Sequence, residues 1–227
     1  MPVEHLTNGI HDTSTSLPPD FKAFKFIPKL IGDKNDSLNA CLRMFEDLDI
    51  VEQFRPKNST LRKFLQTVQK NYKQLPYHNW EHAFAVAHFC YLLLRTPKLK
   101  TQLNDLERLS LLVSSICHDL DHPGTSNSFQ IQYKTPLADL YNNEGSILEK
   151  HHFAQTISIL KSKECDIFEE LSKEDFQHVM NILQDTIMAT DIAVHFSSTM
   201  PRLKKTTEDK NGMERSFKQY MNGMTRT

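Results

Sequence analysis

The stretch LERLSLLVSSICHDLDHPG, residues 106–124, joins a helical run to a dense group of ionisable side chains. Its first part is apolar on nearly every helical face, which is typical of a helix buried on most sides. A Pro-Gly pair ends it, because proline cannot continue a helix. Four ionisable residues stand just before that pair: His118, Asp119, Asp121 and His122. A buried helix needs other helices around it, so the stretch predicts a helical core.

Helical periodicity extends over most of the remaining chain. Only 6 glycines, no alternating apolar-polar run, and apolar residues at i, i+3 and i+4 predict an all-α fold. Ser172, followed three residues later by Asp175, resembles a capping box at the start of the last strong helix. Helices are predicted over residues 36–54, 59–72, 77–94, 106–120, 145–160 and 172–196.

The two ends of the chain lack this periodicity. Residues 1–20 are rich in Ser, Thr and Pro and are predicted to form an extended segment. Residues 201–227 contain basic clusters and Asn-Gly breaks and are predicted to form a divergent, loosely ordered tail. Residues 21–200 then form the folded domain.

The composition restricts the classes of partner. A formal net charge of -1 and a pI near 6.8 give no electrostatic reason to expect a nucleic acid polymer or an anionic membrane. No apolar run is long enough to span a bilayer, and the first residues lack a signal-peptide pattern. We therefore predict a cytoplasmic location, although a larger parent protein could be tethered by other parts.

The four cysteines support the same location. Cys41, Cys90, Cys117 and Cys165 are widely spaced and form no C-x-x-C pattern. Three of them lie in apolar runs, where a reduced thiol acts as a small hydrophobic side chain. This pattern favours a reducing compartment.

Two further histidines stand four residues apart. In HNWEH, His78 and His82 share one helical face about one turn apart. Such a pair could bind one metal ion, or one imidazole could bind metal while the other transfers protons. With 11 histidines in the chain the spacing alone is weak evidence, and taken by itself a surface pair or a core histidine explains it better.

The cluster after the buried helix is stronger evidence. An unpaired buried charge costs several kcal/mol, so these groups must reach solvent or bind a partner. A divalent cation is such a partner, because imidazole and carboxylate are ligands of zinc, manganese and magnesium. Asp119 could bridge two ions through its two oxygens, with Asp121 and His122 binding the surrounding water. The alternative is a helix end carrying solvated charges.

Taken together, these motifs resemble a known family. The patterns PYHNWEHAF and CHDLDHPGTSN, followed by NNEGSILEKHHFAQTISIL and ILQDTIMATDIAVHF, resemble the catalytic domain of class I 3',5'-cyclic nucleotide phosphodiesterases. The resemblance covers roughly residues 20–197 and is most similar to the cGMP-stimulated, dual-specificity type. It implies a compact, multi-helix, HD-type domain that hydrolyses cAMP, cGMP or both to the 5'-monophosphate in signal transduction.

The resemblance also implies roles for individual residues. His82, His118 and Asp119 match the protein ligands of a zinc site, and Asp119 matches the bridge to a second ion, Mg²⁺ or Mn²⁺. His78 matches the general acid that protonates the departing O3'. A cyclic nucleotide is then the small-molecule partner, and a homodimer would form through parts outside this chain.

Other matched residues have competing structural explanations. His122, Glu149 and Thr190 match the groups that bind the water around the second ion. Without the resemblance, Glu149 is better explained as an exposed helical acid and Thr190 as an ordinary helix residue. The helical face of Leu183 and Ile187 would nevertheless carry Thr190 inward. Tyr77 matches a substrate-contacting tyrosine, or it is an aromatic residue that packs on the helix it precedes.

The chain also departs from the family pattern. The family supplies a fourth zinc-site aspartate and a purine-binding glutamine from helices beyond the equivalent of residue 200, and residues 201–227 show neither motif. We therefore expect the N-terminal two-thirds of the catalytic domain, with no prediction of cAMP or cGMP preference. Two alternatives stay open: a non-catalytic truncated isoform acting through interactions, and another HD-type phosphohydrolase such as a nucleotidase.

Overall fold

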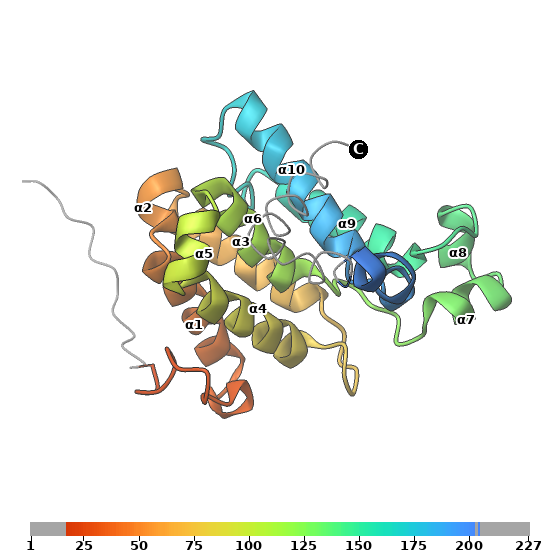
Figure 1. Ribbon diagram of the computed structural model, residues 1–227, viewed down its shortest axis with the longest axis horizontal. Helices are drawn as coiled ribbons and strands as arrows, with labels where there is room; N and C mark the ends of the chain where they lie inside the picture. The colour runs from red at the N-terminus through yellow and green to blue at the C-terminus, as the bar shows by residue number, and fades with distance from the viewer. Residues whose placement is uncertain (1–16, 203, 205–227) are drawn as a thin grey trace, which may run out of the picture.

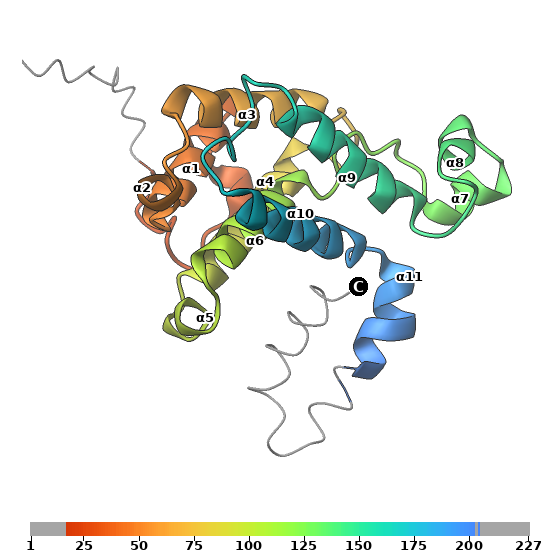
Figure 2. The same cartoon turned by 90° about the horizontal axis from the view of Figure 1, so that it is seen from above.

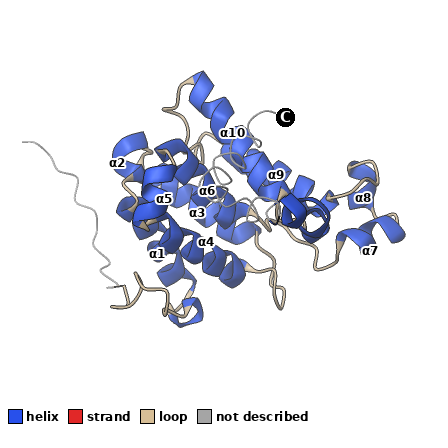
Figure 3. Ribbon diagram, viewed as in Figure 1, coloured by secondary structure: helices blue, strands red, loops and turns tan. Residues whose placement is uncertain are grey.

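The computed structural model describes residues 17–202 and 204, and within them every regular element is a helix (Figure 1, Figure 3). The all-α prediction is therefore confirmed. The long helices are α1 (Lys34–Asp47), α3 (Asn58–Asn71), α4 (Trp80–Leu94), α6 (Asp105–Cys117), α9 (Ile147–Leu160) and α10 (Lys173–Met188). The short ones are η1 (Pro28–Leu30), α2 (Ile50–Phe54), α5 (Pro97–Gln102), α7 (Asn127–Gln132), α8 (Pro136–Leu140), α11 (Ile192–Val194) and η2 (His195–Thr199).

Helix α6 is the centre of the packing. It contacts both α4 and α10, and α9 packs on α10 and α3 (Figure 1, Figure 2). Nine residues of α6 are buried, including Leu112 and Val113 at 0% exposure. A reciprocal capping box between Asn104 and Glu107 fixes its first turn. The prediction of a helix buried on most sides is confirmed.

Several predicted helix boundaries were wrong for local backbone reasons. The segment 36–54 is two helices, because Asp49 adopts a left-handed conformation with φ of 61°. The helix expected from residue 77 begins at Trp80, where the side chain of Asn79 caps it. The helix expected to reach residue 196 ends at Met188, and Asp191 caps the short α11 that follows.

Helices α5, α7 and α8 were not predicted, because each is too short to show an apolar period. Proline in the first turn starts α5 and α8, and a threonine caps each of them. Helices α7 and α8 extend away from the main body of the molecule (Figure 2). They connect the end of the His-Asp cluster to α9.

The chain segment before α1 packs against α4. Phe21 and Phe26 are buried, and the ring of His88 on α4 contacts both. Of the predicted extended segment 1–20, residues 1–16 lie outside the described residues. Of the predicted tail 201–227, residue 203 and residues 205–227 lie outside them as well.

All four cysteines are free thiols, and three of them are buried. No helix within the described part of the chain has the length and apolar character needed to cross a bilayer.

Candidate metal centre

One cleft of about 720 Å³ lies where α4, α6, α9 and α10 meet. The residues before α4, the loop after α6 and the start of α11 complete its wall. All eight site residues predicted from the sequence line this cleft: Tyr77, His78, His82, His118, Asp119, His122, Glu149 and Thr190. The fold thus brings together residues that are more than a hundred positions apart.

Three donor atoms converge at the deep end of the cleft. The Nε2 atoms of His82 and His118 are 3.2 Å apart, and Asp119 Oδ2 lies 3.4 Å from the first and 3.2 Å from the second. Ligand atoms about 2.0–2.1 Å from a tetrahedral zinc ion lie about 3.3 Å from one another. The three side chains therefore fit one tetrahedral cation.

The hydrogen bond on the far side of His118 fixes its tautomer. His118 Nδ1 lies 3.0 Å from the carbonyl oxygen of Ser115, which can only accept, so Nδ1 carries the proton and Nε2 presents a lone pair. Burial opposes ionisation of Asp119, but hydrogen bonds donated by the rings of His118 and His82 when Nε2 carries a proton outweigh it and keep the pKa of Asp119 well below its usual range. A neutral imidazole beside a carboxylate is the ligand state that a divalent cation requires.

Tyr72 supports this triad and was not recognised from the sequence. Its buried hydroxyl donates to the carbonyl oxygen of Ile116 at 2.9 Å and accepts from the amide N–H of Asp119 at 3.2 Å. The hydroxyl thereby pairs two main-chain groups at the end of α6, where helical hydrogen bonding stops. Tyr72 follows the last residue of α3, so it ties that helix to the backbone of a metal-ligand candidate.

A second group of donors lies on the other side of Asp119. Ligand atoms of Asp119, His122 and His152 lie within 4.8 Å of one another. The Nδ1 atom of His122 accepts from the amide of Gly124 at 2.9 Å, so in the neutral ring Nε2 carries the proton and can donate to water. His122 therefore suits the predicted water-binding role better than direct ligation.

His152 faces Asp119 with the opposite tautomer. Its Nδ1 lies 2.7 Å from the carbonyl oxygen of Leu120, so Nδ1 is the donor, and the bare Nε2 is 3.8 Å from Asp119 Oδ1. Burial lowers the pKa of His152 to about 4. Burial and the neighbouring ring of His78 together lower the pKa of His122 to about 4. Two acceptors that face each other need a cation or a water between them, so His152 belongs to the site although the sequence interpretation did not include it.

His78 and Tyr77 stand at the mouth of the triad. The ring of His78 stacks on that of His122 with centroids 3.8 Å apart, and the ring of Tyr77 lies 4.5 Å from that of His82. Tyr77 is 62% exposed and thus contacts the cleft histidines instead of the core. Burial and the neighbouring imidazoles lower the pKa of His78, although Asp119 opposes them.

Glu149 is buried at the start of α9 and does not form the exposed helical acid considered above. Asn127 donates to Glu149 Oε2 at 2.8 Å and accepts from the amide of Leu148 at 2.8 Å, joining α7 to α9. Burial raises the pKa of Glu149, the bond from Asn127 opposes this, and Asp191 and Asp119 raise it further. Asn127 therefore fixes the direction of this carboxyl group in the cleft.

Two expectations about direction were wrong. Thr190 lines the cleft but is exposed, and its hydroxyl donates to the carbonyl of Ile187, because α10 ends two residues earlier and no longer imposes a helical face. Asp121 was expected to bind water in the site. Its carboxylate instead bonds to Lys73 and His151, outside the residues that line the cleft.

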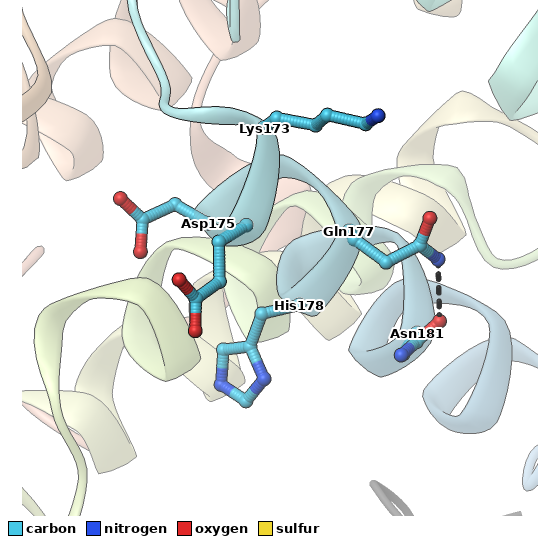
Figure 4. Close-up of a pocket in the computed structure, with 6 residues that line it drawn as sticks. Lys173, Asp175, Gln177, His178 and Asn181 are labelled. Atoms are coloured by element: carbon cyan, nitrogen blue, oxygen red, sulfur yellow. Dashed lines mark hydrogen bonds between the residues drawn. The ribbon is translucent and has the colours of Figure 1, made fainter.

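A second cleft of about 740 Å³ lies along the first half of α10 (Figure 4). Its described lining comes from one helix: Lys173, Glu174, Asp175, Gln177, His178 and Asn181. Gln177 donates to Asn181 within it, as Figure 4 shows. It contains none of the predicted site residues.

Comparisons with known proteins identify the family that combines this helical fold with a cleft lined by two groups of candidate metal ligands. The family model described as 3'5'-cyclic nucleotide phosphodiesterase matches residues 77–225, more than half of the chain. The chain belongs to this family. The chain is also similar to the phosphodiesterase domain of the RhoPDE fusion protein from the choanoflagellate Salpingoeca rosetta, at 31% identity and a TM-score of 0.79. That match covers 90% of this chain and 64% of the solved chain.

Two relatives from Drosophila melanogaster are each 43% identical to this chain. One is a dual 3',5'-cyclic-AMP and -GMP phosphodiesterase 11, matched over 176 residues, 78% of this chain and 12% of that protein. The other is a cGMP-specific 3',5'-cyclic phosphodiesterase, matched over 168 residues, 74% of this chain and 15% of that protein. The chain thus spans a small part of the length of these relatives. The finer likeness to the cGMP-stimulated type stays a prediction.

Proposed function

We propose that this chain carries the metal-binding part of an enzyme that hydrolyses the 3'-ester bond of cAMP, cGMP or both to the 5'-nucleoside monophosphate. The proposal includes a role in signal transduction and a cytoplasmic location. The observation that carries it is the convergence of three donor atoms within 3.4 Å beside His78, in one cleft of a chain from this family.

We assign His82, His118 and Asp119 to a zinc site and Asp119 also to a second ion, Mg²⁺ or Mn²⁺. The tetrahedral spacing of the three donors supports zinc, and the water-facing groups His122 and Glu149 support a second, largely hydrated ion. Thr190 is proposed as a third water-binding group on the cleft rim. When bound, the two ions lower the pKa of water so that it can act as a nucleophile near neutral pH.

His78 is proposed as the group that gives a proton to the departing O3'. Its ring stands beside the triad, with a centroid distance of 6.1 Å to His82, so it can act on an atom next to the bound phosphate. Burial lowers the pKa of His78, but an anionic phosphate nearby favours the protonated form. The exposed Tyr77 at the mouth of the cleft is proposed to contact the substrate.

The test is hydrolysis of cAMP and cGMP by the purified chain in the presence of zinc and magnesium. His78→Ala is expected to abolish product formation, and His178→Ala, a histidine of the second cleft, is the matched control that should leave it unchanged. Equal activity of His78→Ala and the unmodified chain would contradict the role of His78. A folded, zinc-loaded chain that hydrolyses neither nucleotide would contradict the proposed activity of this chain.

A further inference from the structure

Residues 118–122, which follow α6 and contain His118 and Asp119, are called the metal-binding loop. Asp121 of this loop is left without a role by the proposed chemistry. It lies between Asp119 and His122, and its φ of 58° puts it in the left-handed region. A residue with a Cβ adopts this conformation at an energetic cost, which the surrounding structure must offset. Asp121 is not among the residues that line the cleft, and its carboxylate contacts Lys73 and His151, so neither a metal ion nor substrate accounts for the conformation.

All four polar atoms of Asp121 bond to other elements. The amide N donates to the carbonyl of Asn71 at 3.2 Å, and the carbonyl oxygen accepts from Lys73 Nζ at 3.0 Å. The same Nζ lies 2.7 Å from Oδ1, and His151 Nε2 lies 2.8 Å from Oδ2. The residue is thus fixed to the end of α3 on one side and to α9 on the other.

The bonds on the α9 side form a directed chain. The Tyr141 hydroxyl lies 3.3 Å from His151 Nδ1, and His151 Nε2 faces the carboxylate of Asp121. When the proton of the His151 ring is on Nε2, the ring donates to Asp121 and accepts from the Tyr141 hydroxyl at Nδ1. The next residue, His152, donates to the carbonyl of Leu120 at 2.7 Å. Two consecutive residues of α9 therefore bond two consecutive residues of the metal-binding loop.

The ion pair of Asp121 with Lys73 lies near the surface, and the Asp121 side chain is 33% exposed. Lys73 is itself 47% exposed, so its side chain contributes little packing and its contact with the loop is mainly electrostatic.

We propose that Asp121, anchored by Lys73 and His151, is a positioning residue that fixes residues 118–122 in the conformation in which His118 and Asp119 meet His82. The anchor would thereby set the affinity and geometry of the metal site without touching the metal. This inference rests on the proposed function, because it assumes that the triad binds a cation.

The test compares Lys73→Met with Lys63→Met in the purified chain. Lys63 is a similarly exposed lysine of α3 that forms a surface ion pair with Glu164, so it controls for loss of one surface charge and its ion pair. Zinc affinity is measured by chelator competition, and cobalt(II) is the spectroscopic probe of coordination geometry. We expect zinc binding about tenfold weaker in Lys73→Met and an altered cobalt absorption band at saturation, with Lys73→Arg restoring both.

The possible results separate the two claims. Zinc affinity and cobalt spectrum unchanged in Lys73→Met would overturn the positioning role and leave the proposed metal site intact. An unmodified, folded chain that binds neither zinc nor cobalt would overturn the metal site and the positioning role with it. Loss of stability alone would lower the unfolding midpoint but not alter the saturated cobalt spectrum. If Lys73→Met does not fold, Asp121→Asn provides the same comparison with the size of the side chain preserved.

Discussion

Replacing Tyr72 by phenylalanine removes one oxygen atom from the wall behind the metal triad. That hydroxyl is the partner of the Ile116 carbonyl and of the Asp119 amide, and neither group has another hydrogen-bond partner within the described residues. Tyr72, Ile116 and Asp119 are 3%, 1% and 9% exposed, so water does not readily replace the lost bonds. Each buried main-chain group left unpaired costs about 1–3 kcal/mol.

We therefore expect Tyr72→Phe to lower the free energy of unfolding by about 2 kcal/mol or more. Urea unfolding followed by far-ultraviolet circular dichroism measures this difference directly. Tyr133→Phe is the matched control, because Tyr133 is 62% exposed and should change stability by less than about 0.5 kcal/mol. A Tyr72→Phe variant as stable as the control would refute the conclusion that this hydroxyl satisfies both buried groups.

Three further outcomes are expected. Leu112→Ala should cost about 2–5 kcal/mol in urea unfolding, because Leu112 is fully buried at the centre of α6. Asn127→Asp should weaken magnesium binding in a titration, because a second carboxylate would replace the donor to Glu149, whereas an unchanged affinity would argue against that bond. In chelator-treated protein, stability should fall as pH drops from about 6.5 toward 4. The pKa of His122 and of His152 is about 4 in the folded protein, whereas an imidazole in the unfolded chain has a pKa of about 6.5. Proton uptake on unfolding therefore lowers the free energy of unfolding by about 2 kcal/mol per imidazole at pH 5. A flat stability profile between pH 7 and 5 would contradict their burial in the neutral form.

The sequence predicted the presence of the site better than its internal contacts. His118 and Asp119 could be recognised because they follow a buried helix, where polar groups need a partner. His152 could not, because helical periodicity alone does not distinguish it from the adjacent His151. The actual difference is that His152 faces Asp119 and His151 faces Asp121.

The direction of the Asp121 side chain depends on one backbone angle that no residue pattern specifies. Similarly, the left-handed Asp49 divides a segment whose apolar spacing continues unbroken from α1 into α2. Tyr72 was placed correctly at the end of a helix, but its partners come from α6 and the loop after it, more than forty residues away. Contacts of this kind arise from packing and could be identified only in the structure.

The most direct test of the account is the zinc content of the folded chain, measured by native mass spectrometry after incubation with zinc and removal of the excess. The arrangement of His82, His118 and Asp119 predicts one tightly bound zinc ion per chain, retained in His178→Ala and lost in His118→Ala. A folded chain that retains no zinc, or a His118→Ala variant that retains one equivalent, would contradict the assignment of the metal centre.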